Sequence, residues 1–262
     1  MGTVAALQTV GSTGGVSARA FKPLLREVSR STPTCSDCTL RTHCVPAGLE
    51  QDTLGAFDRL RASRMRIKRG DTLYRATDRF TAVYAVRSGS CKTLILSEQG
   101  HEQVTGYHMP GEVVGLDGID NGVHGCQVVA LEDTEVCALP FEALERLAHD
   151  STSFQHNMYR LLSREVARDH KTMLLLGSMR AEQRLAAFLL DLARRYQALG
   201  YSSCEFILRM TREEIGSFLG LKLETVSRLF SRFHHDGVIQ VQGRVVKLLD
   251  RNALQRLVGA EP

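Results

Sequence analysis

The C-terminal third of the chain contains the stretch Thr211-Arg-Glu-Glu-Ile-Gly-Ser-Phe-Leu-Gly220, followed by Leu-Lys-Leu and by Glu224-Thr-Val-Ser-Arg-Leu-Phe-Ser-Arg-Phe-His234. Thr211 and Glu214 form the pattern of a capping box, in which a hydroxyl and a carboxylate satisfy the free amides where a helix begins. Gly220 is placed to end that helix. Apolar residues at helical spacing predict a second helix directly afterwards, from Glu224 to His234. Two helices joined by so short a turn predict a helix-turn-helix.

The start of the second helix carries polar residues that suit the major groove of DNA, namely Glu224, Thr225, Ser227 and Arg228. Arg228 can donate two hydrogen bonds to the O6 and N7 atoms of guanine, and Glu224 can accept one from a cytosine amino group. A two-stranded ribbon expected over residues 238–249, turned at Gln242-Gly243, makes the motif winged. The alternative is that Glu224 and Arg228 only form an ion pair on the helix surface.

The distribution of charge favours the same end of the chain. The 262 residues carry a formal net charge of +4. Residues 1–179 contain 20 Lys and Arg against 20 Asp and Glu, whereas residues 180–262 contain 13 against 9, so the whole excess lies in the last third. A basic domain attached to a neutral body is typical of a protein whose C-terminal part contacts nucleic acid.

Ahead of this region, residues 65–140 have the sequence pattern of a β-domain. Apolar alternation is clearest in residues 80–86 and 93–96. Further short strands are expected at residues 102–105, 127–130 and 135–139, and glycines are frequent between them. Many short strands at regular turn spacing predict an antiparallel β-roll of the jelly-roll type, preceded by a short helix within residues 51–63.

Between the two regions the apolar period becomes helical, with one long helix expected over residues 152–180 and a second over residues 181–199. Six residues of the long helix are spaced like the a and d positions of a two-stranded coiled coil. They are Tyr159, Leu162, Val166, Asp169, Met173 and Leu176. We therefore expect an α+β chain with a flexible tail (residues 1–33), a sensory β-domain (34–150), a dimerisation helix (151–180) and a DNA-binding domain (181–262).

Asp169 is the one charged member of that stripe. In a parallel homodimer its carboxylate would lie near its own copy, and at about 5 Å and an effective dielectric constant near 20 the repulsion is roughly 3 kcal/mol. We hypothesise that Asp169 holds the dimer near a balance point that another site can tip. The alternative is that Asp169 lies at the edge of the seam and is solvated.

The seven cysteines indicate a metal site, and three of them are crowded in Cys35-Ser-Asp-Cys38-Thr-Leu-Arg-Thr-His-Cys44. A fourth ligand must come from elsewhere, and the candidates are Cys91, Cys126, Cys137, Cys204 and His43. A compact triplet with one remote thiolate suits an iron–sulfur cluster. Zinc more often uses paired couples of ligands, but it stays an alternative, as do uncoordinated thiols.

The remaining composition predicts a cytoplasmic protein. The chain has 43% hydrophobic and 24% charged residues. We find no apolar run of about 18 residues that could span a membrane, and residues 1–10 lack the pattern of a secretory signal. Dinucleotide-binding, P-loop, serine-hydrolase and zinc-protease motifs are absent from the sequence, so we expect no enzyme activity.

Together these features resemble one family. The triplet, β-domain, seam helix and winged helix occur in the order found in the oxygen-sensing FNR branch of the CRP/FNR transcription regulators, over about residues 35–258. The motifs that carry the resemblance are Tyr84-Ala-Val-Arg-Ser-Gly89, Gly111-Glu-Val-Val-Gly115, Glu182-Gln-Arg-Leu-Ala-Ala-Phe188 and Glu224-Thr-Val-Ser-Arg228.

This resemblance implies an oxygen-responsive regulator of anaerobic-metabolism genes. It implies that a [4Fe-4S] cluster forms without oxygen on Cys35, Cys38, Cys44 and Cys137, the last in Cys137-Ala-Leu-Pro-Phe141, with Cys126 as the second choice. The cluster would offset the Asp169 repulsion, so that a homodimer binds palindromic promoter DNA and activates or represses transcription. Oxygen would convert or destroy the cluster and loosen the dimer.

The resemblance also concerns other partners. The cyclic-nucleotide branch holds its ligand phosphate with an Arg-Ser pair, and the matching positions here are His124 and Gly125, so no cyclic nucleotide is expected. The loop Glu98-Gln-Gly-His101 resembles a surface that contacts RNA polymerase. Two other functions remain open, a helix-turn-helix regulator with a structural zinc ion and an iron–sulfur electron-transfer protein.

Overall fold

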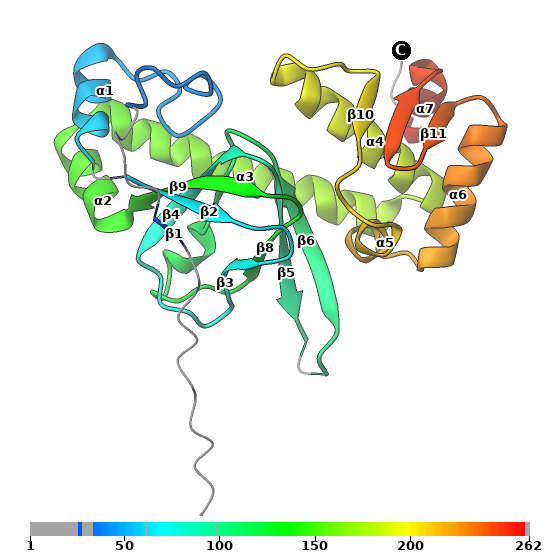
Figure 1. The fold of residues 1–262 in the computed structure, drawn as a ribbon, viewed down its shortest axis with the longest axis horizontal. Coiled ribbons are helices and arrows are strands. Elements are labelled where there is room, and N and C mark those ends of the chain that lie inside the picture. Colours follow the sequence, from blue (N-terminus) through cyan, green and yellow to red (C-terminus); the bar gives the residue numbers. More distant parts are fainter. Residues whose placement is uncertain (1–25, 28–33, 61, 98, 260–262) are drawn as a thin grey trace, which may run out of the picture.

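The computed structural model describes residues 26–27, 34–60, 62–97 and 99–259. A β-roll lies at one end of the molecule and a small α/β domain lies at the other (Figure 1). Helix α3 (Thr152–Ser178) runs from one to the other. Only Arg26–Glu27 of the expected tail fall within the described residues, and they form the short strand β1, which pairs with β2.

The β-roll consists of two antiparallel sheets, which have the strand orders β1-β2-β9-β4-β7 and β3-β8-β5-β6. Their strands are β2 (Ser63–Ile67), β3 (Thr72–Tyr74), β4 (Ala82–Ser88), β5 (Cys91–Leu96), β6 (Glu102–His108), β7 (Val113–Val114), β8 (Gln127–Ala130) and β9 (Thr134–Pro140). Buried Val86, Val114, Val128 and Val136 fill the space between the sheets. The expected jelly-roll class is therefore confirmed.

The strand bounds differ from the sequence prediction in ways that long-range pairing explains. β5 and β6 are longer than predicted because they form one hairpin, paired from Cys91↔His108 to Leu96↔Glu102. β2, β3 and β7 were not predicted. β3 and β7 have three and two residues, and all three take their hydrogen bonds from distant strands. The helix expected within residues 51–63 is α1 (Gln51–Asp58), which ends early.

Two consecutive helices follow the β-roll. α2 (Phe141–Asp150) packs on its sheets, and α3 begins at the N-cap Ser151, whose hydroxyl accepts a hydrogen bond from the amide of Phe154. Phe154 is fully buried against Phe57 of α1, so the N-terminal part of α3 belongs to the β-roll core. The remainder of α3 leaves that core and carries exposed apolar residues.

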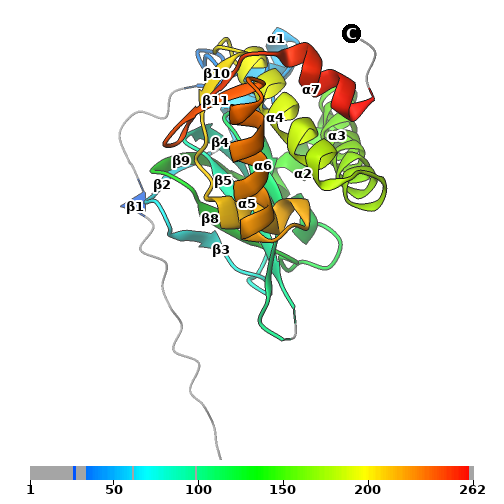
Figure 2. The ribbon, with the colours of Figure 1, turned by 90° about the vertical axis from the view of Figure 1, so that its right-hand side faces the viewer.

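The C-terminal domain has the predicted winged helix-turn-helix. Its elements are α4 (Ala181–Ala198), β10 (Glu205–Ile207), α5 (Arg212–Leu219), α6 (Leu223–His235), β11 (Ile239–Gln242), β12 (Val245–Leu248) and α7 (Arg251–Val258). The predicted inward face of the second helix is buried, at Val226, Leu229, Phe230 and Phe233. The ribbon is β11–β12, to which β10 adds a third strand that the sequence reading missed. Figure 2 shows α5 and α6 presented together on one side.

Arg184 of α4 fixes the junction between α3 and the helix-turn-helix. Its guanidinium group donates hydrogen bonds to the carbonyl oxygens of Leu176 (2.7 Å) and Met179 (2.9 Å), where α3 ends. A third bond, of 2.9 Å, reaches the carbonyl of Leu219 at the end of α5. These carbonyls have no helical partners of their own, because they lie in the last turns of their helices. Arg184 therefore ties the end of α3 to the helix-turn-helix domain.

We expect Arg184→Ala to lower the free energy of unfolding of the C-terminal domain by about 2–4 kcal/mol, because three carbonyls lose a charged donor. Urea denaturation followed by circular dichroism measures the change. The matched control is Arg194→Ala on the same helix, whose exposed side chain pairs with Asp191 alone among the residues that the structure describes. Such a pair contributes about 0–1 kcal/mol. Equal effects of the two substitutions would show that the carbonyl contacts of Arg184 do not stabilise the domain.

In the part of the chain that the structure describes, none of the helices has the length and apolar character needed to cross a membrane.

Candidate functional site

The helix-turn-helix is built as its sequence indicates. The amide of Glu214 donates to Thr211 Oγ1 at 3.1 Å, and the amide of Thr211 donates to Glu214 Oε2 at 2.7 Å, which completes the capping box. Gly220 ends α5 with φ +62°. Gly216 sets the angle between the helices, because a Cβ atom there would lie 2.6 Å from the carbonyl oxygen of Leu221.

The predicted DNA contacts lie on one exposed face in the first turns of α6. Glu224 and Arg228 are exposed, and Thr225 and Ser227 are half-buried beside them. Among the described residues neither Glu224 nor Arg228 takes part in an ion pair, so both side chains are available to a ligand. The surface pair considered as an alternative does not form.

The C-terminal domain also contacts the β-roll, which the sequence did not indicate. Lys92 of β5 pairs with the capping carboxylate of Glu214 at 2.8 Å. Ser217 of α5 accepts from the amide of Val104 at 2.8 Å and donates to the carbonyl of Glu102 at 3.2 Å. The β5–β6 hairpin thus holds α5 directly, through charges and backbone groups more than 100 residues apart in sequence.

The predicted dimer stripe is largely free on α3. Tyr159, Val166 and Met173 have exposed fractions of 57%, 53% and 66%, which is unusual for apolar side chains. Leu162 and Asp169 are exposed on the same face. Leu176 differs from the others, because it packs against the core of the C-terminal domain. The exposed apolar face of α3 therefore runs from residue 159 to residue 173, as an interaction surface would.

Four of the seven cysteines line one small cavity between the 34–50 loop and the β-roll. They are Cys35, Cys38, Cys44 and Cys137. Cys137 lies in β9, in register with Arg64 of β2 and Ala85 of β4, so the sheet presents it toward the loop. The loop itself is a series of tight turns, in which the amide of Cys38 bonds to the carbonyl of Cys35 and that of Cys44 bonds to the carbonyl of Leu40.

Several residues that the sequence did not indicate hold this loop in place. The amide of Cys35 donates to Asp58 Oδ1 at 2.5 Å, at the end of α1. Buried Asn157 of α3 donates its side-chain amide to the carbonyl of Val45, next to Cys44. Arg87 Nη1 lies 3.7 Å from the Cys38 sulfur. The loop is therefore bonded to α1, α3 and β4 at once.

The electrostatics of the cavity favour a positively charged occupant. Burial, with repulsion from the Cys137 sulfur, raises the pKa of Cys35 to about 12. Burial likewise raises the pKa of Cys44 to about 12 and that of Cys137 above its ordinary value, although Arg87 partly offsets the latter. Thiols that are costly to ionise become thiolates when metal cations share their charge.

The four cysteine sulfurs fit the protein ligands that a [4Fe-4S] cluster requires. Across the described ranges, no three His, Cys, Asp or Glu side chains are grouped closely enough to hold a single metal ion.

The other three cysteines lie elsewhere. Cys126 donates to Asp117 Oδ2 at 3.4 Å and contacts the Tyr74 hydroxyl at 4.0 Å. It directly precedes β8, which belongs to the other sheet from the strand of Cys137. Cys91 is buried in β5, and Cys204 is exposed before β10. Neither lines the cavity of the other four.

Of the two positions that match the nucleotide-phosphate pair, His124 is buried inside the β-roll and Gly125 next to it is exposed. The ring of His124 is 2% exposed and stacks on Tyr74, with centroids 3.6 Å apart and planes 14° from parallel. Phe80 meets its edge at 5.5 Å. Asp117 accepts from the amide of Gly125 at 2.7 Å. An aromatic stack and a carboxylate therefore occupy these positions.

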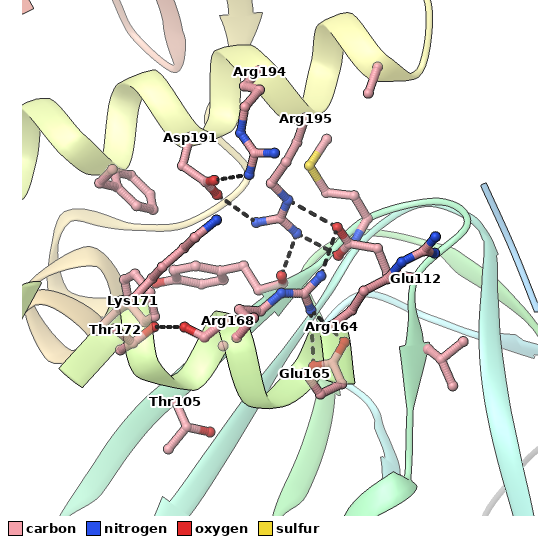
Figure 3. A pocket seen from close by; sticks show the side chains of 18 of the residues that line it. Thr105, Glu112, Arg164, Glu165, Arg168, Lys171, Thr172, Asp191, Arg194 and Arg195 are labelled. Carbon is pink, nitrogen blue, oxygen red and sulfur yellow. Dashed lines mark hydrogen bonds and ion pairs between the residues drawn. The ribbon is translucent and has the colours of Figure 1, made fainter. Parts of the chain in front are cut away.

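A larger cavity of about 640 Å³ lies between α3, α4 and the loop after β6. Apolar Leu161, Leu175 and Phe188 are among the residues that line it. Charged side chains from α3 and α4 also line it (Figure 3). Glu112 binds Arg195 and Arg168 there, which come from α4 and α3. This cavity separates the β-roll from the two helices.

Comparison with known proteins places the chain in a family. A model described as a Crp-like helix-turn-helix domain matches residues 183–257, and a cyclic nucleotide-binding domain model matches residues 64–151. The transcriptional regulatory protein btr of Bordetella pertussis is 50% identical over 87% of this chain and 94% of its own length. The chain belongs to the FNR-type branch of the CRP/FNR transcription regulators.

Two further similarities agree with this assignment. The fumarate and nitrate reduction regulatory protein of Escherichia coli K12 is 40% identical over 86% of this chain and 90% of its own. Among solved structures, FixK2 from Bradyrhizobium japonicum has a TM-score of 0.71 and 30% identity, covering 77% of this regulator and 99% of that chain. The protein is thus a DNA-binding transcription regulator and not an enzyme, as the sequence predicted.

Proposed function

We propose that this regulator senses oxygen through a [4Fe-4S] cluster held by Cys35, Cys38, Cys44 and Cys137, and that the cluster controls dimerisation and DNA binding. The observation that carries the proposal is the cavity lined by all four thiols. Three come from one loop and the fourth from a strand about a hundred residues later, so the fold brings together residues that no local structure would join.

When bound, the cluster would supply an oxygen-labile centre whose bonds to four sulfurs bridge the loop and β9. The residues of the chain then determine the response. Asn157 bonds the loop to α3, so a change in the loop bears on the helix that carries the dimer stripe. If the four sulfurs bind the cluster more tightly in one position of the loop, the difference in binding free energy shifts the equilibrium between the monomer and the dimer.

The dimer is proposed to form along Tyr159, Leu162, Val166, Asp169 and Met173, with Leu176 at its inner end. Two copies related by a two-fold axis would place their α6 helices in successive major grooves, about 34 Å apart, which requires a palindromic site. At each half-site Glu224, Thr225, Ser227 and Arg228 would read the bases. The proposed domains are residues 1–33, 34–150, 151–180 and 181–262.

The family membership also bears on cyclic nucleotides, RNA polymerase and the location of the protein. We expect no response to cyclic nucleotides, because His124 replaces the arginine and stacks on Tyr74. The proposed polymerase contact is the tip of the β5–β6 hairpin, where Gln99, Gly100 and His101 are exposed and Glu98 falls outside the described residues. We propose a cytoplasmic location, because a crowded cysteine triplet that binds metal suits a reducing compartment.

The deciding experiment is anaerobic purification followed by visible absorption spectroscopy and by iron, sulfide and zinc analysis. We expect a coloured protein with about four iron and four sulfide per chain. Exposure to air should bleach the colour and weaken binding to a palindromic DNA. A colourless protein with one zinc per chain would instead identify a structural zinc site, and a coloured protein without DNA binding would indicate electron transfer.

We expect Asp169→Ala to strengthen dimerisation of the cluster-free protein. Removing roughly 3 kcal/mol of repulsion corresponds to a dissociation constant about a hundredfold lower. Sedimentation equilibrium without iron measures it, with Asp150→Ala, an exposed carboxylate just before α3, as the charge-matched control. An unchanged monomer–dimer equilibrium in Asp169→Ala would mean that the carboxylate is solvated in both states.

A further inference from the structure

Glu112 joins three parts of the regulator at a single carboxylate. It lies in the loop between β6 and β7, with its side chain 20% exposed. It accepts from the amide of Met109 at 3.0 Å and binds Arg195 of α4 at 2.5 and 3.1 Å. It also pairs with Arg168 of α3 at 3.2 Å. Figure 3 shows both guanidinium groups converging on it.

The charges at this junction depend on one another. Although burial opposes its ionisation, Arg195 and Arg168 hold the pKa of Glu112 below its ordinary value. Arg195 is itself largely buried and donates to the carbonyl of Tyr107 at 2.6 Å. Without the Glu112 carboxylate, two partly buried guanidinium groups from separate helices would face one another, which is unfavourable.

The residue before Glu112 touches the cysteine loop. Gly111 has φ +89°, and a Cβ atom built there would lie 3.0 Å from the Cβ atom of His43 and 3.2 Å from its carbonyl oxygen. His43 immediately precedes Cys44. The loop backbone therefore rests directly on Gly111, and any shift of the loop bears on the peptide that leads to Glu112.

The two helices that Glu112 holds are those whose positions matter for DNA binding. Arg168 is adjacent to Asp169, so the same turn of α3 faces Glu112 on one side and the exposed stripe on the other. Arg195 lies on α4, the first helix of the DNA-binding domain. His43, Glu112, Arg168 and Arg195 all line the 640 Å³ cavity, which leaves space for this ion-pair group to rearrange.

We infer that Glu112 is the positioning residue through which the cysteine loop sets the orientation of α3 and α4. The inference deepens the proposed function and rests on it, because the loop must respond to a cluster. A change at Cys44 passes through His43 and Gly111 to Glu112, which divides its bonds differently between Arg168 and Arg195. The turn that carries Asp169 then rotates relative to α4.

The test uses the full chain and compares DNA affinity with and without a reconstituted cluster. In Glu112→Gln we expect unchanged iron content and visible spectrum. The ratio of the DNA affinity with the cluster to that without it should be about fivefold or more closer to 1 in Glu112→Gln than in the wild type. A factor of five is the lower end of typical allosteric coupling. The control is Glu142→Gln on α2, an equally charged and exposed carboxylate whose one ion pair in the described part of the chain is with Arg146.

The outcomes separate the inference from the proposed function. A wild-type protein that takes up no iron, or whose DNA affinity ignores the cluster, contradicts the proposed function itself. If the wild type responds and Glu112→Gln keeps the full ratio or loses its iron, the positioning role is wrong. Should Glu112→Gln fail to fold, the same affinity ratio is measured in Arg168→Gln, whose side chain is 33% exposed. This substitution removes the ion pair between Glu112 and α3 and leaves the one between Glu112 and Arg195 of α4.

Discussion

Replacing Arg228 by alanine should abolish specific DNA binding by this regulator while leaving its fold intact. Arg228 is exposed at the start of α6 and has no ion-pair partner among the described residues, so its removal breaks no ion pair there. A bidentate contact to guanine discriminates by about 1–3 kcal/mol, and a dimer makes it twice. We expect the affinity for a palindromic site to fall by about 2–6 kcal/mol.

The measurement is fluorescence anisotropy on a palindromic duplex and on a scrambled one of equal length. Arg256→Ala on α7 removes the same charge from an exposed position and serves as the control. Loss of affinity confined to the palindrome supports base reading. Equal losses on both duplexes, with a shallower salt dependence, would mean that Arg228 binds phosphate instead.

Replacing Cys137 by serine should remove the metal centre, whereas Cys126→Ser should retain it. Cys137 is the thiol of β9 that shares a cavity with the triplet, and Cys126, just before β8, bonds to Asp117. Both variants lose one half-buried thiol, so each is the other's control.

For Cys137→Ser we expect little iron, no visible absorption band and a monomer under anaerobic conditions. Iron and sulfide analysis with sedimentation of both variants measures this. Retained iron in Cys137→Ser together with its loss in Cys126→Ser would reverse the assignment of the fourth ligand.

Local sequence signals predicted those parts of the fold that local contacts form. The capping box at Thr211 and Glu214, the glycine at the end of α5 and the inward face of α6 all depend on residues within one or two turns. The strands of the β-roll were placed less well. β7 consists of two residues that pair with β4 about thirty residues earlier, and no local pattern identifies so short a strand.

The same distinction separates the parts of the candidate site. The triplet could be recognised from its spacing, but spacing alone left five candidates for the fourth ligand. The contacts of Arg184, Asn157 and Glu112 were not predicted, because a polar residue in a helix or loop carries no mark of its distant partner. Leu176 was assigned to the free stripe by its period, although it packs on the C-terminal domain.

The sequence by itself determined which helices form, where the recognition helix begins and which three cysteines stand together, since hydrophobic period and capping act over a few residues. Only the tertiary structure decided which distant cysteine lies beside the triplet and which carboxylate joins the cysteine loop to α3 and α4. Both depend on strand register. The pairing of β9 with β2 and β4 carries Cys137 to the loop, and the turn after β6 places Glu112 between two helices.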